Sequence, residues 1–79
     1  MVTSSQIKAA RALLKWSARE LAEKASVSLV TLKRYEAAEA FPEARLEQFG
    51  RIIKTLENAG VEFLGDPIES PGVRLHRRD

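Results

Sequence analysis

Residues 16–36, WSARELAEKASVSLVTLKRYE, set the architecture because they hold two short helical segments separated by a three-residue break. The first segment opens with the capping box SARE (17–20). In such a box the Ser17 hydroxyl accepts a hydrogen bond from the Glu20 amide, and the Glu20 carboxylate accepts one from the Ser17 amide. The box therefore predicts a helix that starts at Ser17 and runs to about residue 24.

The break is SVS (26–28), and its last residue, Ser28, is an N-cap candidate for the next helical segment. No acidic residue stands three positions after Ser28, so this cap lacks the reciprocal half of a capping box. Leu32 and Tyr35 are three residues apart, which places them on one helical face. We therefore expect another helix over about 29–36.

Helices this short do not persist alone in water, so the pair must be fixed against each other and against a further helix. Small residues are needed where the helices cross, and Ala22 and Ala25 meet that need. The apolar residues that we assign to the inner faces are Leu21, Val27, Leu32 and Tyr35. The outward residues are then Ser28, Leu29, Lys33 and one flank of Val30.

Helical patterns flank this pair on both sides. The preceding one covers residues 5–16, with Ser4 or Ser5 as the cap and with apolar residues at helical spacing: Ile7, Ala10 and Leu14. Residues 37–43 (AAEAFPE) predict a loop, because a proline disfavours helical geometry in the residue before it. The last helix starts near residue 42 or 43 and runs to about Asn58, with an apolar stripe of Leu46, Phe49, Ile53 and Leu56.

The C-terminal segment changes character after Gly60, which fits a helix stop. VEFL (61–64) and VRLH (73–76) alternate apolar and polar residues, and the turn-rich GDPIESPG (65–72) separates them. The expected fold class is therefore mainly α: a four-helix domain over residues 1–60, followed by a short β-hairpin or strand extension with a basic tail over 61–79.

Composition limits the class of protein. The chain has 79 residues, 44% hydrophobic and 30% charged, which suits one small folded domain. It has no cysteine and no apolar run of about 18 residues, and its N-terminus does not resemble a secretory signal, so we expect a cytoplasmic protein. Residues 1–40 carry seven cations against four anions, or +3, while residues 41–79 carry six against seven, or −1. This uneven charge is a weak indication of a polyanionic partner.

The spacing within residues 16–36 resembles the helix-turn-helix of the lambda-repressor and Cro-like (XRE) family. The matching positions are Ser17, Leu21-Ala22, Val27-Ser28, Thr31-Leu32 and Tyr35-Glu36. The resemblance covers about residues 5–58 and implies a bacterial or phage DNA-binding transcriptional regulator. Three positions depart from the pattern. Ala18 replaces a glutamine that contacts the DNA backbone, and Ser26 and Ala38 replace glycines.

The resemblance also implies how such a domain docks, with the third helix in the major groove of double-stranded DNA. Leu29 and Val30 would then contact thymine methyl groups, and Ser28 or Thr31 would hydrogen-bond a base or a phosphate. Lys33 would reach a guanine or a phosphate. The expected phosphate contacts, which fix register without reading sequence, come from Ser17, Arg19 and Arg34.

Three roles remain open for the C-terminal segment. A hairpin that pairs with its copy would build a homodimer, with an interface of Ile52, Val61, Phe63, Val73 and Leu75. A wing would instead place Arg74, Arg77 and Arg78 on phosphates, and the third role is that of a partly disordered tail. Dimerisation is favoured because a short exposed strand tends to pair, and because a dimer doubles the contact with a palindromic site.

Alternative functions stay open as well. The same fold could serve as a protein-interaction module that uses the Leu29-Val30 edge, and Ala18 favours that reading. An antitoxin that represses its own operon and a regulator that contacts RNA polymerase are related possibilities. No catalytic site, metal site or cofactor is expected, because Glu20 and Glu23 share a helix face without a partner cluster and His76 is the sole histidine.

Overall fold

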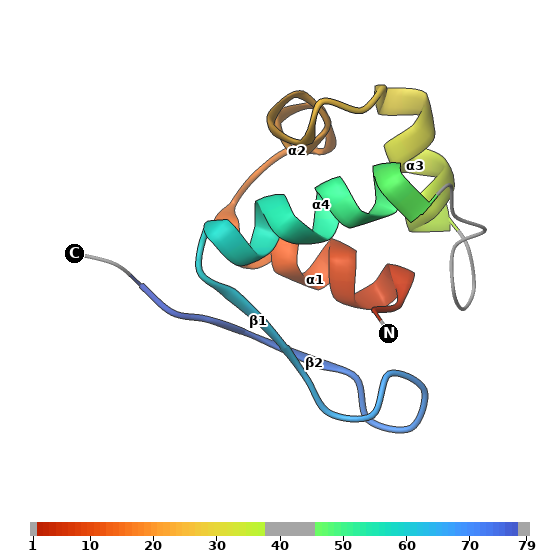
Figure 1. The fold of residues 1–79 in the computed structure, drawn as a ribbon. Helices are drawn as coiled ribbons and strands as arrows, with labels where there is room; N and C mark the ends of the chain where they lie inside the picture. The colour runs from red at the N-terminus through yellow and green to blue at the C-terminus, as the bar shows by residue number, and fades with distance from the viewer. Residues whose placement is uncertain (1, 38–45, 78–79) are drawn as a thin grey trace.

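The computed structural model describes residues 2–37 and 46–77. Within these residues the chain forms four helices, α1 (Ser4–Leu14), α2 (Ala18–Ala25), α3 (Leu29–Ala37) and α4 (Leu46–Asn58), followed by strands β1 (Val61–Leu64) and β2 (Gly72–Leu75). Figure 1 shows α2 and α3 at one end of the molecule and the hairpin across the opposite end, below α1 and α4. This arrangement confirms the expected fold class. Ala37, expected as the first residue of the loop over 37–43, is the last residue of α3. The rest of the expected loop and the expected start of the last helix fall on residues 38–45, outside the described residues.

Helix α1 is capped by Thr3, so the expectation of Ser4 or Ser5 as the cap is wrong. The Thr3 side chain accepts from the Gln6 amide, and the Gln6 side chain accepts from the Thr3 amide at 2.9 Å, which is a complete capping box. Three consecutive hydroxyl residues compete for the cap, and only Thr3 has a glutamine three residues later. Ser4 is buried instead, and its hydroxyl donates to the carbonyl of Tyr35 in α3.

One core joins all four helices to the start of β1. Its buried hydrophobic residues are Ile7, Ala10, Leu21, Ala22, Ala25, Leu32, Tyr35, Phe49, Ile52, Leu56 and Val61. Burying an isoleucine or leucine side chain contributes roughly 1.5–3 kcal/mol, so the fully buried members dominate the stability of this small domain. The Tyr35 and Phe49 rings meet edge to face, with centroids 5.9 Å apart, and so join α3 to α4.

Two residues expected at a dimer interface belong to this core. Ile52 has no exposed surface and Val61 has 4%. The helical stripe of α4 is wider than the sequence spacing suggested, because the hairpin and α1 both pack against it. The expectation that Ile52 and Val61 face a partner is therefore wrong for this fold. Phe63, Val73 and Leu75 are half-buried against the same core.

The hairpin is antiparallel and packs against the helices. Val61 pairs with Leu75, and Phe63 pairs with Val73, so one face of the hairpin is apolar and rests on the core. The buried Gln6 fastens the far end of the hairpin to α1 by donating to the carbonyls of Gly72 at 3.0 Å and Leu64 at 3.4 Å.

Gly60 makes the entry into β1 possible. Its φ of +106° is a backbone conformation that other residues rarely adopt, and an added Cβ would lie 2.4 Å from the His76 carbonyl oxygen. The Gly60 carbonyl also accepts from the His76 amide at 2.8 Å. Gly60 is therefore the helix stop that the sequence predicted.

Candidate nucleic-acid interface

The turn between α2 and α3 spans residues 26–28, where the sequence predicted a break between two helices. Ser26 adopts the left-handed conformation, with φ +57° and ψ +42°, and its amide donates to carbonyls in the last turn of α2. The Ser28 hydroxyl accepts from the Thr31 amide at 3.0 Å, so Ser28 caps α3 as expected. The chain therefore turns within three residues and starts α3 at a fixed point beside α2.

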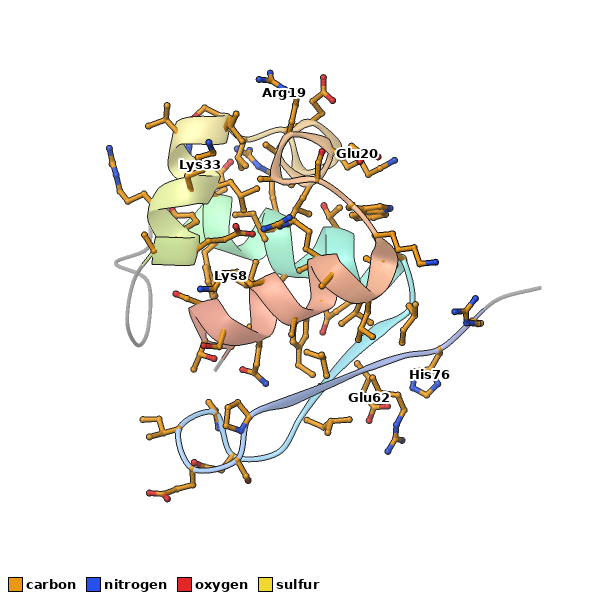
Figure 2. All side chains as sticks on the ribbon, turned by 180° about the vertical axis from the view of Figure 1, so that it is seen from behind. Lys8, Arg19, Glu20, Lys33, Glu62 and His76 are labelled. Atoms are coloured by element: carbon orange, nitrogen blue, oxygen red, sulfur yellow. The ribbon has the colours of Figure 1, made fainter. Side chains whose placement is uncertain are left out.

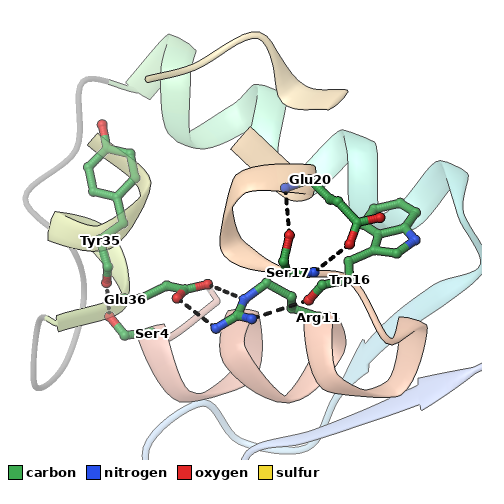
Figure 3. A network of polar contacts seen from close by, with 7 residues as sticks. All are labelled: Ser4, Arg11, Trp16, Ser17, Glu20, Tyr35 and Glu36. Atoms are coloured by element: carbon green, nitrogen blue, oxygen red, sulfur yellow. Dashed lines mark hydrogen bonds and ion pairs between the residues drawn. The ribbon is translucent and has the colours of Figure 1, made fainter. Parts of the chain in front are cut away.

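The capping box at the start of α2 is present in full. The Glu20 amide donates to the Ser17 hydroxyl, and the Ser17 amide donates to the Glu20 carboxylate, both at 3.0 Å (Figure 3). The bonds from the Ser17 backbone and side chain lower the pKa of Glu20 below its ordinary value. The two bonds satisfy backbone amides at the start of α2 and so fix where this helix begins.

The outward side of α2 and α3 is mostly polar and carries both cations and the carboxylates of Glu20 and Glu23. Of the expected site residues, the exposed ones are Ser17, Arg19, Ser28, Val30, Lys33 and Arg34, and Thr31 is half-buried. Figure 2 shows Arg19 and Lys33 at one end of the molecule, with Glu62 and His76 of the hairpin at the other. Arg19 of α2 and Lys33 of α3 therefore lie at the same end of the molecule, away from the hairpin.

The two apolar residues expected on this surface behave differently. Val30 keeps 68% of its surface exposed, whereas Leu29 is half-buried and packs against the core. Among the described residues, Val30 is not one of the hydrophobic side chains that pack against the core. Leu29 offers much less apolar surface, so the expectation of an outward Leu29 is only partly met.

A comparison with protein families gives this arrangement its identity. Residues 7–57, well over half of the chain, match the helix-turn-helix family of the XRE and lambda-repressor-like type. The chain belongs to this family. It is therefore a DNA-binding helix-turn-helix regulator. No curated protein matches the chain.

The helix-turn-helix unit of this regulator is held by an ion pair that sequence reasoning missed. Arg11 in α1 and Glu36 in α3 meet in a bidentate pair, with Nε–Oε2 2.9 Å and Nη2–Oε1 3.1 Å (Figure 3). The Arg11 Nη1 also donates to the carbonyl of Trp16, in the link between α1 and α2. No local pattern marks this pair, because its partners are 25 residues apart in the chain.

Trp16 has a second contact in the regulator. The Lys24 ammonium lies 5.0 Å from the centroid of its ring, a cation–π arrangement. Trp16 is half-buried against the core rather than fully inside it. The contact joins the link before α2 to the last turn of α2, within the helix-turn-helix unit.

In the described part of the chain, no group of three His, Cys, Asp or Glu side chains is placed to hold a metal ion. A hollow of about 150 Å³ lies between α1 and β2, lined by Ser5, Gln6, Ala9, Pro71, Gly72 and Val73. Among residues 2–37 and 46–77, no helix combines the length and apolar character needed to cross a bilayer.

Proposed function

We propose that this protein is a sequence-specific transcriptional regulator that binds double-stranded DNA as a homodimer, with α3 in the major groove. The observation that carries the proposal is the two-sided character of α3. Leu32 and Tyr35 are buried, whereas Val30 and Lys33 are exposed beside the cap residue Ser28. A helix anchored on one face and free on the other, with its N-terminal turn exposed, suits insertion into a groove.

The cap residue Ser28 and the side chains of Val30, Thr31 and Lys33 each have a chemical role in this docking. Val30 packs against a thymine methyl group, which is the apolar feature of the major groove. The Ser28 hydroxyl lies 2.8 Å from the Thr31 hydroxyl, and when Ser28 donates this bond, Thr31 keeps its own proton for a base or a phosphate. Lys33 supplies a charge for a guanine or a phosphate.

The phosphate contacts come from both helices. Arg19 on α2 and Arg34 on α3 are exposed and lie on either side of the turn, and Ser17 is exposed at the N-terminus of α2. Contacts of this kind set orientation, while base contacts supply the specificity. Ala18 offers no side-chain donor, so the backbone contact that its family position implies is absent here.

The hairpin is the proposed dimerisation element, and its hydrogen-bond pattern defines which edge is open. The His76 amide bonds the Gly60 carbonyl, so this pair is a hydrogen-bonded one. Hydrogen-bonded and non-bonded pairs alternate along an antiparallel ladder. Given the register, Glu62 turns its backbone groups toward β2, and Phe63 turns its groups outward.

By the same alternation, Val73 and Leu75 turn their backbone groups to the outer edge of β2. Self-pairing along β2 is unfavourable in the registers centred on Val73, Arg74 and Leu75. A two-fold axis at Arg74 would place the two Arg74 side chains opposite each other, and an axis at Leu75 would place Arg74 opposite His76 of the second copy. An axis at Val73 would pair Leu75 with Pro71, which has no N–H to donate. β2 also makes the extensive contact with α1.

Self-pairing along β1 has one favourable register. A two-fold axis at Phe63 opposes the two Phe63 residues and places Glu62 opposite Leu64 of the second copy. No like charges then face each other, whereas an axis at Glu62 would oppose two carboxylates. We therefore propose a dimer whose β1 strands pair about Phe63 over residues 62–64, since Val61 is buried in the core, and the hairpin's place at the far end from Arg19 favours this role over a wing on DNA (Figure 2).

A second candidate function is that of a protein-interaction module on the same fold. The specific observation behind it is Ala18, which is half-buried against the core where a DNA-contacting side chain is expected. In that case the exposed Val30 would contact a protein partner.

Selection from a random-sequence duplex library with the purified protein separates the two candidates. We expect enrichment of a two-fold-symmetric site whose half-sites lie about one helical turn apart, and a footprint over both halves. Binding should also weaken steeply with salt, because each neutralised phosphate releases counterions. No enriched sequence, together with a flat salt response, would overturn the proposal and favour the interaction module.

A further inference from the structure

Arg51 connects α4 to the turn that orients α3. Its Nη2 donates to the carbonyl of Ser26 at 3.2 Å, and its Nη1 donates to the carboxylate of Glu47, one turn earlier in α4, at 3.1 Å. Ser26 is the left-handed residue that ends α2. The side chain of Arg51 therefore holds the turn from outside the helix-turn-helix pair.

This contact acts on the most constrained point of the turn. A non-glycine residue in the left-handed conformation costs about 1–2 kcal/mol, so Ser26 favours relaxation to another backbone geometry. A carbonyl at a helix C-terminus carries partial negative charge, which a guanidinium stabilises. Since α3 begins three residues after Ser26, any rotation of this peptide changes the direction of α3.

The position of Arg51 differs from that of an ordinary surface arginine. Its Nε is buried and has no hydrogen-bond partner among the described residues. The two outer nitrogens of the same guanidinium reach the Ser26 carbonyl and the Glu47 carboxylate, so these two bonds hold the guanidinium beside the turn.

We infer that Arg51 is a positioning residue for DNA binding, which fixes the Ser26 turn and thereby the angle at which α3 enters the groove. This inference rests on the proposed function. Arg51 itself does not need to touch DNA in this role. Its effect passes through the backbone of residues 26–28.

The test compares Arg51→Met with Glu47→Gln as the matched control. Arg51→Met removes the bond to Ser26, whereas Glu47→Gln removes only the exposed ion pair within α4. We expect Arg51→Met to weaken binding to the selected duplex about tenfold and Glu47→Gln by less than about twofold. A loss of binding in Glu47→Gln equal to that in Arg51→Met would overturn the inference.

Two further measurements, amide exchange and a rescue variant, separate the inference from a loss of fold and from the proposed function. Amide exchange in the free protein should quicken at Val27, whose amide bonds the Ala22 carbonyl, in Arg51→Met but not in Glu47→Gln. This readout needs no DNA, so it holds even when the parent protein binds none. Unchanged exchange at Val27 would overturn the inference, whatever the DNA result.

Rescue by Ser26→Gly identifies the route of action. Glycine adopts the left-handed conformation without strain, so the turn no longer depends on Arg51. The double variant Ser26→Gly with Arg51→Met should therefore recover most of the lost DNA affinity. An Arg51 that contacts a phosphate directly predicts no recovery, and that result would overturn the positioning role.

Discussion

Arg11 and Glu36 join α1 to α3 through two parallel hydrogen bonds of 2.9 and 3.1 Å, and the Glu36 side chain is only 9% exposed. The pair fixes the C-terminal half of α3 to the first helix, while Arg51 fixes the turn before α3. The helix that carries the proposed base contacts is therefore held at both ends by arginines from outside it.

Removal of Arg11 should destabilise the protein strongly. Arg11→Met leaves the nearly buried Glu36 carboxylate without its counter-ion, which we expect to lower the free energy of unfolding by about 2–4 kcal/mol. Urea denaturation followed by circular dichroism measures the change. Glu47→Gln breaks an exposed pair and should cost less than about 1 kcal/mol, so equal losses in the two variants would contradict the role given to Arg11.

The cations of α3 should carry DNA affinity. Lys33→Ala combined with Arg34→Ala removes two proposed phosphate or base contacts and should lower the slope of log K against log salt by about 1–2. Fluorescence anisotropy with the selected duplex at several salt concentrations measures the slope. The control, Lys54→Ala with Arg77→Ala, removes the same charge from α4 and the C-terminal segment. A control that loses as much affinity would point to α4 or the C-terminal segment as the DNA contact.

Val30 should read a thymine methyl group. Replacement of thymine by uracil at the contacted position should weaken binding of the parent protein, because uracil lacks the methyl group. Val30→Ser should lose this difference, while its stability changes by less than about 0.5 kcal/mol because Val30 is exposed. Ile68, which is 67% exposed in the hairpin turn, supplies the control. Ile68→Ser should discriminate thymine from uracil as the parent does.

Charge at position 64 should set the strength of the proposed dimer. In the register about Phe63, Leu64 faces Glu62 of the second copy. Leu64→Lys places opposite charges there and Leu64→Glu places like charges, and both variants lose the same apolar contact. Sedimentation equilibrium should show the lysine variant to dimerise at least about tenfold more tightly, since two symmetric pairs change together. Equal dissociation constants would exclude this register.

The pKa of the Glu62 carboxyl should depend on its contact with His76. The hydrogen bond from His76, at 2.6 Å, lowers the pKa of Glu62, and the nearby Arg74 acts in the same direction. A carboxyl with a lowered pKa stabilises the fold above its ordinary pKa, and this contribution is lost as the pH falls through the lowered value. NMR titration should give a higher pKa for Glu62 in His76→Gln. The Glu20 carboxyl, bonded to Ser17, should be unchanged.

Much of the fold, and the exposure of several candidate site residues, could be predicted from the local sequence. The capping box of Ser17 and Glu20, the cap at Ser28 and the stop at Gly60 each involve residues within a few positions of one another. Hydrogen bonds and steric limits act at that range, so the residue types alone fix where α2 and α3 begin and where the hairpin is entered. The helical spacing of the apolar residues in α2 and α3 leaves Arg19, Lys33 and Arg34 off the buried faces, and all three are exposed.

The tertiary structure alone decided which side chains from distant segments meet. Arg11 and Glu36, and likewise Arg51 and Ser26, are each 25 residues apart, and no spacing rule links such partners before the helices are placed. Ile52 is buried because of how α4 packs against α1, α2 and β1. The apolar spacing within α4 does not specify that packing. Helix periodicity says which residues share a face, whereas packing decides what that face meets.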